Sequence, residues 1–202
     1  MKQLVLATAN AHKVIEFQRI LNELIPDLEL IAASSFPGVP EVSETGATFA
    51  ENALLKARAI SEFTKLPALA DDSGLCVECL SGSPGIYSAR YASPTSNDAQ
   101  NVEKILKEIE DVETDLLGAH FECALAFVDL SENIELVVDG VMQGSLIKEV
   151  RGKNGFGYDP IFVPQGLSQT SAEISNSEKD QLSHRGKALR KMAVILSQLD
   201  FA

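Results

Sequence analysis

The stretch Leu4-Val5-Leu6-Ala7-Thr8-Ala9-Asn10 is a short apolar run that ends in polar residues. A run of this kind, partly β-branched, predicts a buried strand. Asn10 is a residue type that caps helices. After it, apolar side chains recur three and four positions apart, as on one buried helix face: Val14, Phe17, Leu21 and Leu24. The chain therefore opens with a strand, a loop and a helix, which is the repeating order of α/β proteins.

The remaining sequence continues this alternation and then changes character. Strands are expected at residues 28–32, 67–70, 119–128, 134–138 and 145–150, and helices at 48–65, 102–109 and from about 183. Thr48 followed by Glu51 is a capping-box pattern at the start of the second helix. Because strands and helices alternate early and a block of strands follows, we predict an α/β fold with a mixed sheet. The length of 202 residues predicts one domain, residues 1–202.

Acidic residues outnumber basic residues, 29 to 17, which gives a net charge of −12. This balance argues against a nucleic-acid polymer as partner, because binding to the phosphate backbone needs a basic face. A small phosphate ligand needs only a few local cations, so the net charge does not exclude it.

The cysteines Cys76, Cys79 and Cys123 are an odd number and imply no complete disulfide framework. Cys76 and Cys79 form a C-x-x-C, but no second such pair supplies the other ligands of a zinc site, which favours small, half-buried thiols. No apolar run approaches the roughly 18 residues of a membrane span, and the apolar start is too short for a secretion signal. We therefore expect a cytoplasmic protein with no membrane partner.

Three stretches differ from what packing alone would select, and the first is Thr8-Ala9-Asn10-Ala11-His12-Lys13. It joins the first predicted strand to the first helix. Such a turn directs backbone N–H groups and the positive end of a helix at one point, which suits phosphate. The alternative is a plain capped helix with a solvated lysine, and this segment alone does not separate the two.

The second stretch is Ala70-Asp71-Asp72-Ser73-Gly74, at the end of a predicted apolar strand. Adjacent carboxylates are hard to explain by packing there, since buried charges need partners. Mg²⁺ favours one or two carboxylates together with substrate phosphate oxygens, so Asp72 is a natural ligand. Glu44, in a loop, could supply a second carboxylate. The alternative is an ordinary turn, because Asp, Ser and Gly all favour turns.

The third stretch is Gly155-Phe156-Gly157-Tyr158-Asp159-Pro160, followed by Lys179 and by His184-Arg185. Glycines on both sides of Phe156 let a flat base approach its ring. His184 and Arg185 can donate hydrogen bonds from the start of a helix. The alternatives are a core phenylalanine and a surface basic cluster. The cations of this acidic chain gather in or beside the three stretches: Lys13, Lys56, Lys153, Lys179, Arg185 and Lys187.

Together these stretches closely resemble the inosine triphosphate pyrophosphatase family, which hydrolyses non-standard purine nucleoside triphosphates. The matching segments occur in family order over nearly the whole chain: 7–13, 44–53, 70–75, 84–91, 155–162 and 183–189. One departure is Ala9, where the family usually has glycine. If that position requires a positive φ, alanine costs about 1 kcal/mol and loosens the loop.

The resemblance implies an elongated two-lobed α/β fold, with a central mixed sheet flanked by helices and an active-site cleft between the lobes. It also implies Mg²⁺ dependence, a homodimer, and cleavage of ITP, dITP and XTP between the α- and β-phosphates. Asp72 is then the catalytic carboxylate and, with Glu44, a metal ligand. The substrate-binding residues carried over are Thr8, Ala9, Asn10, Ala11, His12, Lys13, Ser73, Phe156, Gly157, Tyr158, Asp159, Lys179, His184 and Arg185.

Recognition of the base follows from hydrogen-bond polarity. Hypoxanthine and xanthine carry a 6-oxo acceptor that His184 and Arg185 could satisfy, whereas adenine carries a donor there. Guanine is expected to be rejected near C2 by backbone N–H groups of residues 156–159. A nucleotide sensor without hydrolysis is the main alternative function, and a pyrophosphatase for other nucleotides, such as modified pyrimidines, is a second.

Overall fold

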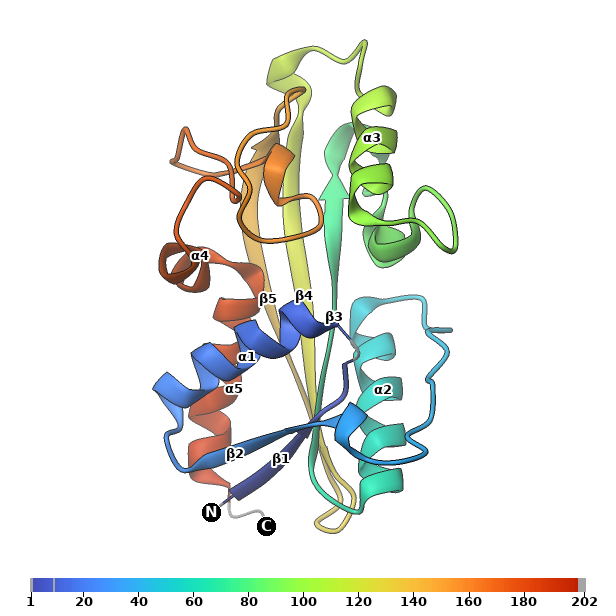
Figure 1. Cartoon of the computed structure of the whole chain (residues 1–202), viewed down its shortest axis with the longest axis vertical. Helices are drawn as coiled ribbons and strands as arrows, with labels where there is room; N and C mark the ends of the chain where they lie inside the picture. Colours follow the sequence, from blue (N-terminus) through green and yellow to red (C-terminus); the bar gives the residue numbers. More distant parts are fainter. Residues whose placement is uncertain (1, 9, 200–202) are drawn as a thin grey trace. The chain divides into compact units, whose positions relative to one another are not determined.

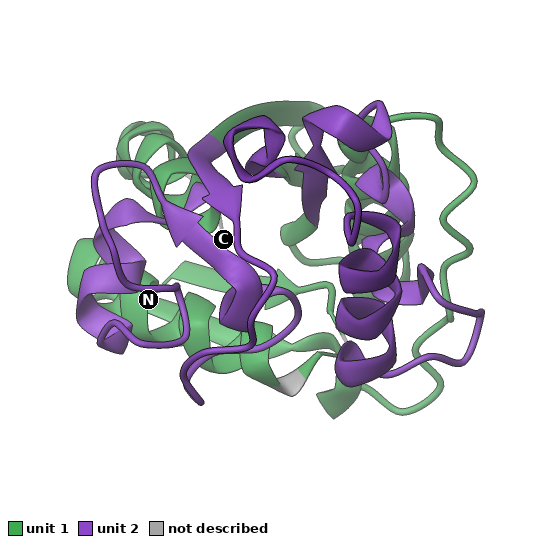
Figure 2. Ribbon diagram, turned by 90° about the horizontal axis from the view of Figure 1, so that it is seen from above, with its two compact units in different colours: residues 1–72, 123–140, 185–202 green, residues 73–122, 141–184 purple. Residues whose placement is uncertain are grey.

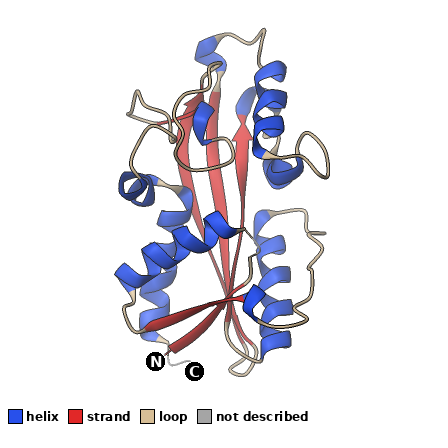
Figure 3. Cartoon of the chain, in the orientation of Figure 1, coloured by secondary structure: helices blue, strands red, loops and turns tan. Residues whose placement is uncertain are grey.

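The computed structural model describes residues 2–8 and 10–199 (Figure 1). Its strands are β1 (Lys2–Leu6), β2 (Leu28–Ala32), β3 (Ala68–Val77), β4 (Gly118–Asp129), β5 (Ile134–Leu146) and β6 (Phe162–Pro164). Its α-helices are α1 (Ala11–Leu24), α2 (Phe49–Thr64), α3 (Asp98–Glu108), α4 (Asn176–Leu182) and α5 (His184–Gln198). Figure 3 distinguishes the helices from the strands and loops.

The strands form one sheet in the order β2-β1-β3-β4-β5-β6. β1 pairs in parallel with both β2 and β3, whereas β5 and β6 are antiparallel. The predicted α/β class with a mixed sheet is confirmed. Among the described residues, no helix combines the length and the hydropathy that a membrane span requires.

The chain divides into two compact units, coloured separately in Figure 2. Unit 1 contains residues 1–72, 123–140 and 185–202, and unit 2 contains residues 73–122 and 141–184. Three boundaries fall inside β3, β4 and β5, so each of these strands contributes residues to both units, and the fourth falls in α5 between His184 and Arg185. The prediction of a single domain stays a prediction.

The core of unit 1 packs α1 and α5 against the strands. Phe17 and Leu21 of α1 are buried as predicted, together with Leu189 and Met192 of α5. Leu24, which the helical spacing placed on the same face, is 38 % exposed because the helix ends there. Figure 1 shows α1 and α5 on one side of the strands of unit 1 and α2 on the other.

Helix α2 begins as the capping pattern predicts, with one difference. The Thr48 hydroxyl accepts the Glu51 N–H at 3.2 Å, but the Glu51 carboxylate accepts the N–H of Ala47 rather than that of Thr48. The predicted apolar face of the helix is buried: Phe49, Ala53, Ala57 and Ile60.

The core of unit 2 lies between α3 and its part of the sheet. Alternate residues of β4 point inward, and the ring of Phe121 meets that of Phe162 edge-on at 4.7 Å. Ile105 and Ile109, predicted as buried helix positions, are fully buried.

Two expectations about elements were wrong, and two short elements were not predicted. β3 does not end at Asp71 but continues to Val77, because tertiary partners compensate the two carboxylates inside the strand. β5 is one strand, not two at 134–138 and 145–150, since pairing in the sheet carries it past Asp139-Gly140. The short elements β6 and α4 were not predicted, because three and seven residues are too few to show a clear hydrophobic period.

Candidate active site

Two adjacent carboxylates lie in the middle of β3, within unit 1. Asp71 and Asp72 are 1 % and 7 % exposed. Successive side chains of a strand point to opposite faces, so the two carboxylates have different surroundings. The interpretation of Asp71-Asp72-Ser73-Gly74 as an ordinary turn is therefore wrong.

Asp71 is bound by cations from α1 and α5. Its Oδ2 accepts from Lys13 Nζ at 2.8 Å and from Nε and Nη2 of Arg185, both at 3.3 Å. Arg185 also donates through Nη1 to Glu16. Burial alone would raise the pKa of Asp71, but the charges of Lys13, Arg185 and Lys56 outweigh it and hold that pKa well below its usual range. Asp71 is therefore a permanent anion that anchors the cations around it.

Asp72 is bound from α2. Its Oδ2 accepts from Asn52 Nδ2 and its Oδ1 from Lys56 Nζ, each at 3.1 Å. Lys56 also donates to Glu44 Oε1 at 2.8 Å, so one ammonium joins both predicted metal ligands. Burial raises the pKa of Asp72; Lys56 opposes this shift, and the charge of Glu44 adds to it. Asp72 is thus a stronger proton acceptor than an ordinary aspartate.

The side chain of Asn52 is fixed at both ends. Its Oδ1 accepts the N–H of Gly46 at 2.8 Å, while its Nδ2 binds Asp72. A Cβ at Gly46 would lie 2.7 Å from Glu51 Cβ and 2.8 Å from Asn52 Oδ1, so only glycine lets this loop approach α2 so closely. Asn52 and Lys56 are four residues apart, which places them on the same helix face.

Sequence reasoning missed Asn52 and Glu16 as members of this cluster. Both are polar residues beside buried apolar neighbours, Ala53 and Phe17, and are themselves 0 % and 4 % exposed. The sequence did contain a signal for these two residues. A charged or amide side chain beside the buried face of an amphipathic helix needs a hydrogen-bond partner inside the protein.

The loop at residues 8–13 forms the predicted helix cap. Thr8 Oγ1 accepts the Asn10 N–H at 3.2 Å, and Asn10 Oδ1 accepts the N–H groups of His12 and Lys13 at 2.9 and 3.3 Å. Ala11 starts α1, His12 is exposed, and Lys13 turns back to Asp71 rather than into solvent. Ala9 lies outside the described residues, so the expectation about its φ stays a prediction.

In unit 2, Asp159 organises the segment around Phe156. Its Oδ2 accepts the N–H of Phe156 at 2.8 Å and also binds Lys179 Nζ. The same ammonium lies 4.9 Å from the centroid of the Phe156 ring. Gly155 has φ +75°, and a Cβ there would collide with Asp159 Oδ2. The half-buried Phe156 ring is thus fixed by a tight loop, and it is not a core residue.

The neighbouring residues of this segment are also engaged. Gly157 N–H donates to Asp98 at 2.7 Å, and the hydroxyl of the buried Tyr158 donates to the carbonyl of Ser88 at 2.8 Å. The N–H groups of Phe156 and Gly157 therefore have carboxylate partners. Rejection of guanine by these N–H groups stays a prediction. It requires the two N–H groups to leave their carboxylate partners and face the base.

His184 and Arg185, adjacent in sequence, have different roles in the structure. His184 stacks on Phe121 in unit 2, with ring centroids 4.9 Å apart and planes 9° apart. Arg185 joins the Asp71 cluster of unit 1. Both are buried, so the idea of a surface basic cluster is wrong for them, whereas Lys153 and Lys187 are exposed. Ser73 is half-buried in β3, at the first position of unit 2.

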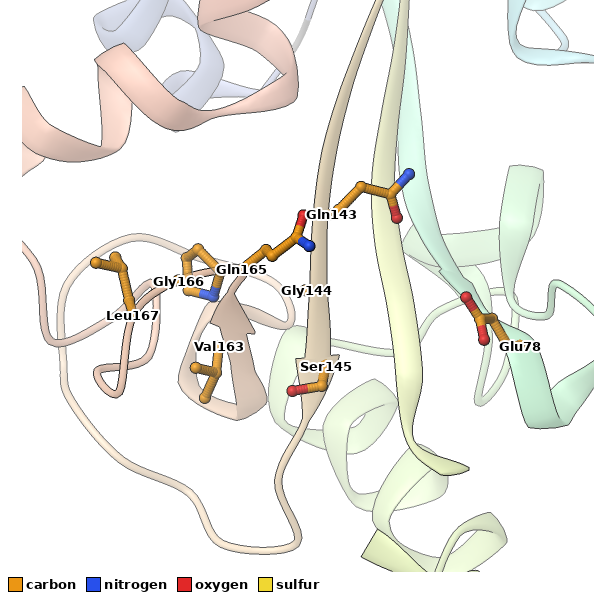
Figure 4. A pocket seen from close by; sticks show the side chains of 9 residues that line it. Glu78, Gln143, Gly144, Ser145, Val163, Gln165, Gly166 and Leu167 are labelled. Atoms are coloured by element: carbon orange, nitrogen blue, oxygen red, sulfur yellow. The ribbon is translucent and has the colours of Figure 1, made fainter. Parts of the chain in front are cut away.

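Unit 2 also contains a pocket of about 530 Å³ that sequence reasoning did not indicate (Figure 4). Its lining comes from the segment after β3, from β5, and from β6 and the turn that follows it: Glu78, Gln143, Gly144, Ser145, Val163, Pro164, Gln165, Gly166 and Leu167. None of the residues predicted to bind substrate or metal lines it.

Residues 4–195 match the model of the Ham1 family. The chain belongs to the Ham1 family. Two curated relatives, from Streptomyces coelicolor and Bacillus licheniformis, are each called dITP/XTP pyrophosphatase. They are 47 % and 45 % identical to this chain, over 98 % of it in both cases and over 99 % and 100 % of their own lengths. The predicted family is thereby confirmed.

Solved structures agree with this membership. A HAM1 protein from Coxiella burnetii superposes with a TM-score of 0.88 at 40 % identity, covering 98 % of this chain and all of that one. The Ham1 protein from Staphylococcus aureus gives a TM-score of 0.86 at 37 % identity, covering 98 % and 99 % of the two chains. This member of the Ham1 family therefore shares the fold of its relatives along essentially its whole length.

Proposed function

We propose that this protein hydrolyses non-standard purine nucleoside triphosphates, dITP, ITP and XTP, to the monophosphate and pyrophosphate. The names of its relatives give the substrate class. The observation that carries the proposal is the Asp72 site of unit 1, a buried carboxylate whose two oxygens accept from Asn52 and Lys56.

Asp72 is the proposed general base. Its raised pKa makes it a better acceptor for the proton of an attacking water, because burial disfavours its ionised form. Asn52 holds one carboxylate oxygen, and Gly46 in turn holds Asn52, so the carboxylate has a defined orientation. Asp71, which stays ionised, keeps Lys13 and Arg185 in place and does not serve as the base.

The donor set of the Asp72 site also fits a magnesium ion. Oxygens of Asp72 and Glu44 both lie within 3.1 Å of the Lys56 ammonium, so they already share one cation. Carboxylate oxygens are the ligands that Mg²⁺ prefers. A bound Mg²⁺ would neutralise charge that develops on the phosphates. We propose Asp72 and Glu44 as its protein ligands.

Lys13 and Lys56 would add positive charge beside the triphosphate, since both ammonium groups are only partly exposed and already lie near carboxylates. We propose that Thr8, Asn10, Ala11 and His12 bind phosphate with them, as the family resemblance implies, and Ala9 likewise.

For the purine we propose the segment Phe156–Asp159 with Lys179, Ser73, His184 and Arg185. The fixed ring of Phe156 provides a stacking face for a base.

We further propose that the protein is a homodimer in the cytoplasm and binds neither a nucleic-acid polymer nor a membrane. The acidic net charge of −12 and the free thiols of Cys76, Cys79 and Cys123 support the location and the lack of a polymer partner. The dimer rests on the family resemblance alone.

A substrate panel tests the activity. Purified protein with Mg²⁺ should release pyrophosphate from dITP and XTP at kcat/KM values at least about 100-fold above those for dATP, dGTP and dTTP. A preference for dTTP or dUTP would overturn the purine assignment. Binding of dITP without release of pyrophosphate would favour a nucleotide sensor.

A further inference from the structure

Three side chains of unit 2 that the proposed function does not use gather on one face of its sheet. The ligand atoms of Cys76, His120 and Glu122 all lie within 4.8 Å of one another. His120 and Glu122 are alternate residues of β4, and Cys76 comes from the neighbouring strand β3. A thiolate, an imidazole and a carboxylate are together the ligand types of zinc.

The core of unit 2 fixes the direction of these side chains. Leu75 and Val77, on either side of Cys76, belong to the apolar core, as do Ala119 and Phe121 on either side of His120. Because side chains alternate along a strand, Cys76 and His120 point away from that core, and Glu122 shares the face of His120. The strands therefore present all three groups in one direction without rearrangement of the backbone.

Within residues 2–8 and 10–199, the side chains of His120 and Glu122 form no hydrogen bond or ion pair. Burial and the nearby charge of Glu122 raise the pKa of the Cys76 thiol to about 11. The Cys76 thiol is therefore protonated in the absence of a metal, and a divalent ion bound between it and Glu122 would favour its thiolate form.

A further carboxylate lies just beyond the end of β3. A Cβ at Gly118, two residues before His120, would lie 2.5 Å from Glu78 Oε2, so Glu78 rests beside β4. Glu78 follows Cys76 by two residues and is the first residue after β3. Its charge increases the local attraction for a cation.

We propose that Cys76, His120 and Glu122 bind a zinc ion, separately from the Asp72 site of unit 1. Ligands at 2.0–2.3 Å from a tetrahedral zinc lie about 3.3–3.8 Å apart, so small side-chain rotations close the observed cluster onto the ion. Binding forms a Zn–S bond and releases the thiol proton to solvent, without oxidation or reduction. Three protein ligands leave the fourth position for water, and the ion ties β3 to β4.

Cobalt provides the direct test, because a Co²⁺–thiolate bond has a charge-transfer band in the near ultraviolet that oxygen ligands lack. Full-length protein stripped of metal should develop this band on titration with Co²⁺ and lose it on addition of Zn²⁺. Cys76→Ser should abolish the band, and Cys79→Ser, which changes the exposed thiol of the same C-x-x-C, should retain it. Absence of the band from the unmodified protein, or its persistence in Cys76→Ser, would overturn the proposal.

If Cys76→Ser does not fold, the other two proposed ligands can be tested with the variants His120→Asn and Glu122→Gln. Both side chains are only half-buried, and each change should weaken Zn²⁺ binding at least about 100-fold, since loss of even outer-shell partners costs 10–100-fold. Glu149→Gln, at an exposed position of unit 2, is the matched control. Unchanged Zn²⁺ affinity in both ligand variants would refute the site. Turnover of dITP with Mg²⁺ and no Zn²⁺, measured in parallel, tests the proposed activity independently.

Discussion

The Asp71–Asp72 cluster of unit 1 and the Asp159 cluster of unit 2 both pair buried carboxylates with lysines, but they are built differently. In unit 1 the partners come from helices far apart in sequence, such as Lys13 on α1 and Lys56 on α2. In unit 2, Asp159 binds the N–H of Phe156, only three residues away. The first arrangement sets the charge and the proton affinity of two carboxylates inside a buried strand, whereas the second fixes the loop that carries the Phe156 ring.

Within unit 1, the two adjacent aspartates illustrate how strand geometry divides roles. Their pKa values shift in opposite directions, since Lys13 and Arg185 outweigh the effect of burial at Asp71, whereas burial, together with the negative charge of Glu44, outweighs Lys56 at Asp72. Adjacent residues on a strand can therefore serve as a permanent anion and as a base, because the sheet separates their surroundings.

The largest expected effect is that of Asp72→Asn on turnover. Asparagine keeps the shape but cannot accept the proton, so kcat for dITP should fall about 10²–10⁴-fold, measured by pyrophosphate release. The free energy of unfolding should change by less than about 1 kcal/mol, because burial already disfavours the ionised form of Asp72. Asp139→Asn, at an exposed carboxylate of unit 1, should leave kcat unchanged. Retained activity in Asp72→Asn would move the base elsewhere.

Asp71→Asn should have the opposite profile and chiefly reduce stability. It leaves Lys13 and Arg185 with one fewer anion in a buried setting, which costs about 3–5 kcal/mol. Urea denaturation measures this loss against Asp139→Asn as control. A loss below about 1 kcal/mol would show that the Asp71 ion pairs do not hold unit 1 together.

Urea denaturation repeated at low pH tests whether ionised Asp71 stabilises the folded protein. Its pKa is lower in the folded protein than the unfolded value of about 3.9. The stabilisation is therefore complete above pH 3.9 and is lost as the pH falls through the folded value. The difference in unfolding free energy between the unmodified protein and Asp71→Asn should shrink only in that acidic range; a difference that already shrinks above pH 5 would contradict the assignment.

Phe156→Ala should affect binding rather than chemistry. Loss of a stacking ring removes about 1–3 kcal/mol, so KM for dITP should rise roughly tenfold or more with kcat nearly unchanged. Phe156→Tyr should restore the KM, and Phe63→Ala, at an exposed phenylalanine of α2, should not alter it. A fall in kcat at constant KM would place Phe156 closer to the reacting phosphates than the stacking proposal allows.

The smallest effect is expected where an ion pair is exposed. Arg58 and Glu135 form a two-point pair in unit 1 with N–O distances of 2.7 and 2.5 Å, yet their side chains are 48 % and 38 % exposed. Arg58→Ala should cost less than about 1 kcal/mol in a double-mutant cycle with Glu135→Ala. A cost equal to that of Asp71→Asn would mean that charge pairing, and not burial, decides stability here.

Local patterns in the sequence determined most of the secondary structure. The first strand, the Asn10 cap, the buried face of α2 and the alternation along β4 follow from hydrophobic period and capping chemistry, which act over a few residues. The family resemblance also came from sequence alone, because six short segments in a fixed order are specific together.

Only the tertiary structure decided how charges are paired. Sequence placed Asp71 and Asp72 at a strand end, since two carboxylates inside a buried strand are unfavourable without partners. Lys13, Lys56 and Arg185 supply those partners from 16 to 114 positions away. No local pattern records such distant pairs, so the opposite pKa shifts of the aspartates, the roles of Asn52 and Glu16 and the gathering of Cys76 with His120 emerge only when the chain is folded.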